Sequence, residues 1–236
     1  MKIAILMAQA DVSDFSRRFP DDGEKFITLL SNERPDWEYS NHMVFQGEFP
    51  RDITNYDGFL ITGSTASSND TDAWVQRLQE MVRAIDGAQI PLFGACFGHQ
   101  LIAKALGGTV VENPGGWRFG VAHSAIATPC KWMAPTNAAL PQYAAHCEQV
   151  SRLPIGATTY ATAKGTPHAG FTKGTHIATT QYHPEMTCSF FDQLVGALAG
   201  ILPTATIANA RAEKDQEVRG DLMARWIVQF FEQSSR

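Results

Sequence analysis

The sequence lacks the features that mark secreted, membrane-spanning and nucleic-acid-binding proteins. Its 236 residues include 24 acidic and 19 basic side chains, for a net charge of −5, without long runs of either sign. This balance argues against nucleic acid and against a membrane surface as partners. No stretch approaches the roughly 20 apolar residues of a membrane span. The apolar run at residues 3–7 is too short for a secretory signal, so we expect a cytoplasmic protein.

Cysteine is scarce and is not arranged for metal binding or disulfides. The four cysteines are Cys96, Cys130, Cys147 and Cys188, and no two have the two-residue spacing of zinc knuckles or redox dithiols. The scattered histidines form no i, i+4 pair beside carboxylates, so we expect no metal site. A glycine-rich segment at residues 113–117 lacks the lysine of a phosphate loop. The sequence therefore predicts free thiols in a reducing compartment.

Apolar runs alternate with helical patterns in the first half of the chain. Residues 3–7, 58–62 and 90–93 are apolar runs, as in parallel strands that are covered on both faces. Between them, apolar residues recur at three- and four-residue steps, at Trp74, Leu78, Met81, Val82 and Ile85. This alternation predicts an α/β fold with a doubly wound, mainly parallel central sheet and helices on both faces. In such sheets, ligands bind at the carboxyl ends of the strands.

The second half has a different pattern. Short strand-like runs divided by glycine or proline lie at residues 109–111, 120–128, 157–162, 168–172 and 176–182. We expect these runs to extend the sheet with mostly antiparallel strands. Two helical stripes follow residue 188, and Trp226 and Phe230 lie on the second, where they would pack that helix onto the sheet or, alternatively, face a partner. We predict one domain over residues 1–190 and a C-terminal helical extension over residues 191–236 packed on it.

A cysteine stands where a buried strand gives way to a helix, within residues 94–100 (GACFGHQ). Small residues at positions 94, 95 and 98 let the backbone turn sharply, as in the elbows that present nucleophiles. The amino end of the following helix favours a thiolate at Cys96. An isolated cysteine is more often inert core, so the hypothesis of a nucleophile also requires a base.

The candidate base is His183, which lies with Pro184 and Glu185 directly after the last strand-like run. A thiol nucleophile needs a histidine that takes its proton and later returns one to the leaving group. The histidine in turn needs an acceptor that fixes its tautomer. Proline restricts the backbone between His183 and Glu185, so their side chains can meet. The two motifs lie far apart in the chain, so only the fold can join them.

Residues 94–100 and 181–185 (QYHPE) together resemble the catalytic motifs of the class I (triad) glutamine amidotransferases. The similarity is greatest to free-standing, GMP synthase-like members, which have similar motifs at residues 61–64, 106–108, 113–117 and 146–150. The resemblance covers about residues 1–190. It implies that Cys96 is the nucleophile, His183 the base and Glu185 its orienter. It also implies an oxyanion hole formed by the backbone N–H groups of Gly63 and Phe97.

The resemblance further implies that Gln100 helps to hold a glutamine-like substrate, and that no metal or cofactor takes part. One departure lies at His146-Cys147-Glu148, where relatives usually have His-Gly-Asp in a segment that lines the substrate pocket. We expect a structural role for Cys147, although substrate preference could differ here. His99 should point away from the thiol, so we expect it to pack or hydrogen-bond rather than act as the base.

The implied reaction is hydrolysis of a γ-glutamyl amide through a γ-glutamyl thioester, which releases glutamate and ammonia or an amine. Three possibilities stay open. The protein could be a glutaminase subunit that hands ammonia to a separate synthase. It could be a self-sufficient γ-glutamyl peptidase that acts on a small γ-glutamyl compound. It could also be a non-catalytic regulatory homologue, which the intact Cys96, His183 and Glu185 disfavour.

Overall fold

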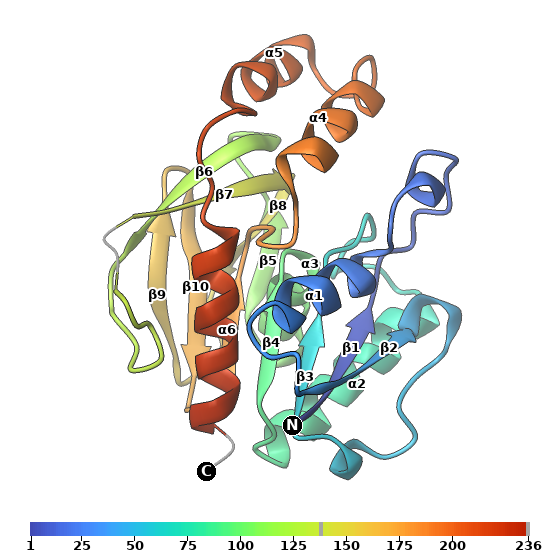
Figure 1. Ribbon diagram of the computed structural model, residues 1–236, viewed down its shortest axis with the longest axis vertical. Helices are drawn as coiled ribbons and strands as arrows, with labels where there is room; N and C mark the ends of the chain where they lie inside the picture. The colour runs from blue at the N-terminus through green and yellow to red at the C-terminus, as the bar shows by residue number, and fades with distance from the viewer. Residues whose placement is uncertain (137–138, 235–236) are drawn as a thin grey trace.

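The computed structural model describes residues 1–136 and 139–234 (Figure 1). Its centre is a nine-stranded sheet with the order β2-β1-β3-β4-β11-β10-β9-β6-β7. The first five of these strands are mutually parallel, and they are β2 (Glu38–Met43), β1 (Lys2–Met7), β3 (Gly58–Ile61), β4 (Leu92–Ala95) and β11 (Ile177–Thr180). The predicted α/β class and mainly parallel core are confirmed.

An antiparallel wing continues the sheet from β11. It consists of β10 (Thr166–Lys173), β9 (Ala157–Ala163), β6 (Arg118–Ile126) and β7 (Ala139–His146). Strand β7 was not among the predicted runs, and the expected antiparallel extension is correct for β6, β9 and β10. It is wrong for β5 (Thr109–Glu112), which pairs with β8 (Glu148–Arg152) in a separate two-stranded sheet, and for β11, which runs parallel to β4. The apolar run of β11 is typical of a strand that has a neighbour on each side. The run does not indicate whether each neighbouring strand is parallel or antiparallel to it.

Helices cover both faces of the parallel strands because successive side chains of a strand point to opposite faces. Ile3 and Ile5 of β1 join one core cluster with α1 (Asp22–Ser31) and α6 (Gly220–Ser234). Ala4 and Leu6 join a second cluster with α2 (Ala73–Gly87) and α3 (Phe97–Ala105). Figure 1 shows α1 and α6 in front of the sheet, with α2 and α3 behind it.

Two further helices lie beyond the antiparallel wing, α4 (Cys188–Ala197) and α5 (Thr204–Glu213). Phe191 of α4 packs on Phe119. It also stacks on Tyr143, and the centroids of these two rings lie 4.3 Å apart. Short 3-10 turns complete the fold at Ser16–Arg18 (η1), Val44–Gln46 (η2) and Ile53–Asn55 (η3). No helix in the described ranges is both long and apolar enough to span a membrane.

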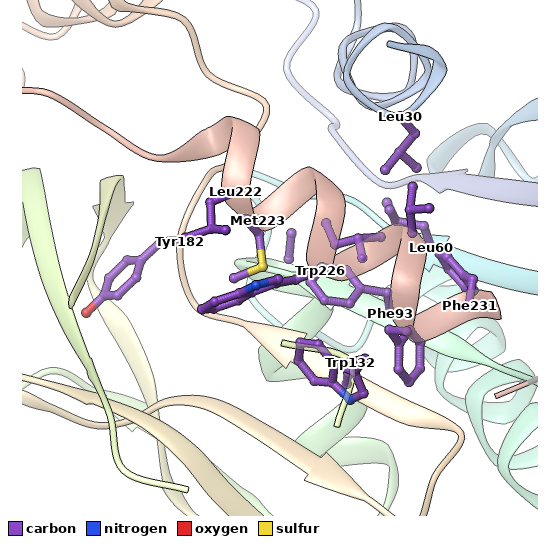
Figure 2. Packing of buried hydrophobic residues seen from close by; sticks show 14 of the residues in the cluster. Leu30, Leu60, Phe93, Trp132, Tyr182, Leu222, Met223, Trp226 and Phe231 are labelled. Carbon is purple, nitrogen blue, oxygen red and sulfur yellow. The ribbon is translucent and has the colours of Figure 1, made fainter. Parts of the chain in front are cut away.

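Helix α6, within the predicted C-terminal extension, contributes directly to the main core. Trp226 and Phe230 are fully buried there, together with Phe93 of β4. Figure 2 shows the Trp226 ring near Trp132, and their centroids lie 6.3 Å apart. These side chains therefore face the sheet, as the helical stripe indicated, and are not available to a partner.

Candidate functional site

Cys96 is the single residue between β4 and α3. Its backbone has φ 50° and ψ −106°, a conformation that costs free energy for any residue other than glycine. The surrounding chain holds it there, because the Cys96 N–H donates to the Thr180 carbonyl at 2.9 Å. The Gly98 N–H likewise donates to the Thr62 carbonyl at 3.1 Å. The strained residue of the elbow is thus the candidate nucleophile itself.

Glycine is required at the elbow because neighbouring backbone approaches closely. A Cβ at Gly98 would lie 2.4 Å from the Ile61 carbonyl oxygen. A Cβ at Gly94 would lie 2.7 Å from the Gly98 carbonyl carbon. Backbone atoms cannot rotate away as a flexible side chain can. The small residues seen in the sequence are therefore a steric condition for this turn.

We expect Gly98→Ala to destabilise the protein by about 1–3 kcal/mol, because the added methyl group overpacks the contact with Ile61. Gly196→Ala in α4 is the matched control, since a Cβ there meets nothing within 4 Å and alanine favours a helix. Denaturant midpoints of both variants check this prediction. Equal stability of Gly98→Ala and the unmodified protein would contradict it.

His183 and Glu185 form a buried pair beside Cys96. Nδ1 of His183 lies 2.7 Å from Oε1 of Glu185, and the two side chains are 5% and 0% exposed. The backbone N–H of His183 donates to the Tyr143 carbonyl of β7 at 2.9 Å, which fixes the segment after β11 to the antiparallel wing. Nε2 of His183 has no hydrogen-bond partner among the described residues.

Charge around His183 governs its protonation. Burial alone lowers the pKa of this imidazole, but the negative charges of Cys96 and Glu185 outweigh burial and raise the pKa well above 6.5. Cys96 directly follows β4 and His183 lies shortly after β11, the parallel neighbour of β4, so the two distant motifs lie at the same edge of the sheet, where the Cys96 backbone N–H donates to Thr180 at the end of β11.

Gly63 and Phe97 flank this group. Gly63 lies two residues after β3, and a Cβ there would come within 3.0 Å of Cε1 of His183. Phe97 is the first residue of α3, and the first N–H groups of a helix have no partner inside it. Two backbone amides predicted to bind an oxyanion thus lie next to Cys96 and against His183.

Gln100 is engaged with the protein itself. Its Nε2 donates to the Glu148 carbonyl at 2.8 Å and to Oε1 of Gln181 at 3.3 Å. It lies in the second turn of α3 and is almost fully buried. Gln100, for which a substrate contact was predicted, thus uses its amide nitrogen to link α3 to β8 and to the segment before His183.

Glu148, which the sequence marked only as a departure in a segment that lines the substrate pocket, connects two parts of the chain. Its carboxylate accepts hydrogen bonds from Ser67 Oγ, at 2.9 and 2.8 Å, and from Asn69 Nδ2 at 3.3 Å. Its backbone carbonyl accepts from Gln100 and, at 2.9 Å, from Nδ1 of His146. It therefore holds the loop after Gly63 against β8. The serine- and asparagine-rich composition of that loop is the one available sequence signal.

Two further histidines near the site are structural. Nδ1 of His99 lies 2.8 Å from Thr179 Oγ1, in line with the expected hydrogen-bonding role, and burial lowers the pKa of His99 to about 3. Burial also lowers the pKa of His146 to about 4. Both rings are therefore neutral at pH 7. The described residues contain no group of three or more His, Cys, Asp or Glu side chains that could hold a metal ion.

Comparison with known proteins identifies similar chains. Residues 35–196 match the family model described as Glutamine amidotransferase class-I. Gamma-glutamyl peptidase 3 of Arabidopsis thaliana is 26% identical over 82% of this chain and 80% of its own length. A shorter match, 34% identical, joins 47% of the chain to 44% of gamma-glutamyl peptidase 4 from the same plant.

A GMP synthase (glutamine-hydrolyzing) of Streptomyces coelicolor is 31% identical over 62% of the chain, but the match spans only 29% of that enzyme. Among solved structures, a glutamine amidotransferase from Thermotoga maritima has a TM-score of 0.78 and 17% sequence identity. That alignment covers 100% of this chain and 98% of the other. At this identity, the structural likeness shows a common fold.

Proposed function

This chain belongs to the class-I glutamine amidotransferase family, and from that premise we propose that it hydrolyses a γ-glutamyl amide with Cys96 as the nucleophile. The observation that carries the proposal is the strained elbow at Cys96 beside the buried His183–Glu185 pair. A strained nucleophile, a base whose second nitrogen has no partner and an acceptor that orients the base are the parts that acyl transfer requires.

In the first half-reaction, the Cys96 sulfur attacks the γ-carbonyl carbon and a C–S bond forms. The proton on Nε2 of His183 passes to the departing nitrogen as the C–N bond breaks, so ammonia or an amine leaves. Glu185 holds Nδ1 and stabilises the imidazolium before this transfer. The product is a γ-glutamyl thioester on Cys96.

In the second half-reaction, His183 takes a proton from water as the water oxygen attacks the thioester carbonyl. The C–S bond breaks, glutamate leaves, and Cys96 and His183 return to their starting states. In both steps the N–H groups of Gly63 and Phe97 would donate to the carbonyl oxygen as negative charge develops. Removal of one such donor typically costs about 3 kcal/mol of transition-state stabilisation. Gln100 would position the glutamyl portion.

We expect Glu185→Gln to move the alkaline limb of the kcat/KM profile to lower pH. The raised pKa of His183 keeps the ring protonated above pH 6.5, and acylation needs that proton for the leaving group. Loss of the Glu185 charge lowers the pKa of His183, so the proton leaves at lower pH. Steady-state rates from pH 5 to 10 check this. An unchanged limb would show that Glu185 does not tune the imidazole.

The physiological form of the reaction has two candidates. Similarity to gamma-glutamyl peptidases over most of the chain favours a self-sufficient hydrolase of small γ-glutamyl compounds. Similarity to a GMP synthase favours a glutaminase subunit that delivers ammonia to a separate synthase. In either role the thiol must stay reduced, as it does in the cytoplasm.

An assay of the purified protein alone distinguishes the two. The peptidase role predicts rapid release of glutamate from γ-glutamyl peptides without any partner. The subunit role predicts little release from glutamine until a synthase is added. If no glutamate is released from any γ-glutamyl amide or peptide, with or without such a partner, the proposed activity is wrong.

A further inference from the structure

A buried ion pair lies beside the proposed active site. Nζ of Lys25 lies 2.8 Å from Oδ1 of Asp22, and the two side chains are 13% and 8% exposed. Oδ2 of Asp22 is directed toward Gly63, because a Cβ at Gly63 would lie 3.8 Å from it. The same Cβ would lie 3.0 Å from Cε1 of His183. Asp22 and the imidazole thus approach Gly63 together.

Lys25 also contacts helix α4, which follows the segment that contains His183 and Glu185. Nζ of Lys25 lies 3.6 Å from the centroid of the Phe190 ring, and Phe190 follows shortly after Glu185 in the chain. Phe15 and Phe19 pack on Phe190, at centroid distances of 6.0 and 5.0 Å. In Figure 1, the segment between β1 and α1 lies toward the same end of the sheet as α4. Lys25 of α1 therefore lies against α4, the helix that begins shortly after Glu185.

Both members of the ion pair can form further hydrogen bonds. A lysine ammonium has three donors, and one of those on Lys25 is directed to Asp22. Among the described residues, Oδ2 of Asp22 accepts one long hydrogen bond, from Gln9 Nε2 at 3.5 Å. Removing two charges from water costs free energy that their mutual attraction only partly returns. The arrangement is better suited to binding a charged ligand than to stabilising the fold.

Other cations near the site are already engaged or exposed. Arg118, whose charge is felt by His146, lies 3.5 Å from Glu213 and donates to the Val121 carbonyl. Arg18 is exposed and lies over the Phe15 ring. Because the whole chain has a net charge of −5, an anionic group is not attracted by the overall field. An anion at this site would depend on Lys25.

We propose that Asp22 and Lys25 form a subsite for the leaving group and that this leaving group is an α-amino acid, an inference that rests on the proposed γ-glutamyl hydrolysis. The N–H of the scissile amide would donate to Oδ2 of Asp22, and the α-carboxylate would accept from Nζ of Lys25. His183 transfers its proton to the nitrogen as the C–N bond breaks. The free amino acid then gains a proton from water and leaves as a zwitterion that matches the charges of the pair.

Three substrates test the subsite: γ-glutamylalanine, γ-glutamylalaninamide and glutamine. The first two differ only in the charge of the leaving group. We expect the unmodified enzyme to show a kcat/KM at least about tenfold higher for γ-glutamylalanine than for its amide, as for a charge-assisted hydrogen bond. Equal values for the two would overturn the proposal without any variant.

Lys25→Met tests the assignment of the cation. We expect the preference for γ-glutamylalanine over its amide to fall at least about tenfold, to nearly one. The matched control is Lys164→Met, which removes an exposed lysine from the turn between β9 and β10 and should keep the preference. An undiminished preference in Lys25→Met would overturn the subsite.

Failure of this inference differs from failure of the proposed function. If the unmodified enzyme hydrolyses glutamine but is indifferent to the leaving-group carboxylate, the γ-glutamyl reaction stands and the subsite is wrong. If it hydrolyses none of the three substrates, with or without an added synthase, both are wrong. If Lys25→Met does not fold, as judged by circular dichroism, the comparison of substrates in the unmodified enzyme decides the question.

Discussion

Replacement of Cys96 by alanine should abolish release of glutamate from every γ-glutamyl substrate. Without the sulfur no thioester can form, and the paired His183 and Glu185 have no nucleophile to serve. The fold should survive, because alanine fills the same small space at the elbow. We expect the rate to fall at least about 10³-fold, to the level of the assay background.

The matched control is Cys188→Ala, which removes an exposed thiol at the start of α4. It should retain turnover, and both variants should show the circular dichroism spectrum of the unmodified protein. Unchanged turnover in Cys96→Ala would refute the nucleophile. Loss of turnover in both variants would show that the assay reports general damage to the protein.

Trp226→Ala should have the largest effect on stability. The Trp226 ring is fully buried between α6 and the sheet, and its Nε1 donates to the Pro135 carbonyl at 3.2 Å. Truncation removes a large apolar surface and leaves a cavity that a close-packed core fills poorly. We expect the free energy of unfolding to decrease by about 3–5 kcal/mol, measured by chemical denaturation.

Trp117→Ala is the control for this change, because Trp117 is 40% exposed. Its stability should stay within about 1 kcal/mol of the unmodified protein. If Trp226→Ala were as stable as Trp117→Ala, α6 would not be part of the main core. The helix would then be a dispensable extension.

The parallel half of the fold could be predicted from the sequence because its signals are local. Continuous apolar strands such as β3 and regular stripes such as that of α2 show both element type and burial. Strand β7 gave no such signal, since it buries Gln142 and His146 and contains Pro141. Helix α5 was also missed, because it buries only Ile207 and Ala210 and has no apolar stripe.

The candidate site was predictable to the extent that its chemistry lies in short motifs. The cysteine at the elbow and the histidine and glutamate around Pro184 are each contiguous, so residue type and order were informative. The contacts of Lys25 and Glu148 were not predicted, because their partners lie elsewhere in the chain. The contact of Lys25 with Phe190 joins α1 to α4, and that of Glu148 with Ser67 joins β8 to the loop after β3. Such contacts depend on topology.

The central claim is that Cys96 differs from the other three cysteines in its chemistry. A glutamine-like chloroketone, which carries the electrophilic carbon at the position of the γ-carbonyl group, tests this most directly when the labelled peptides are mapped by mass spectrometry. We predict one adduct per chain, on Cys96, with Cys130, Cys147 and Cys188 unmodified. Labelling spread evenly over all four cysteines, or absent from Cys96, would contradict the account.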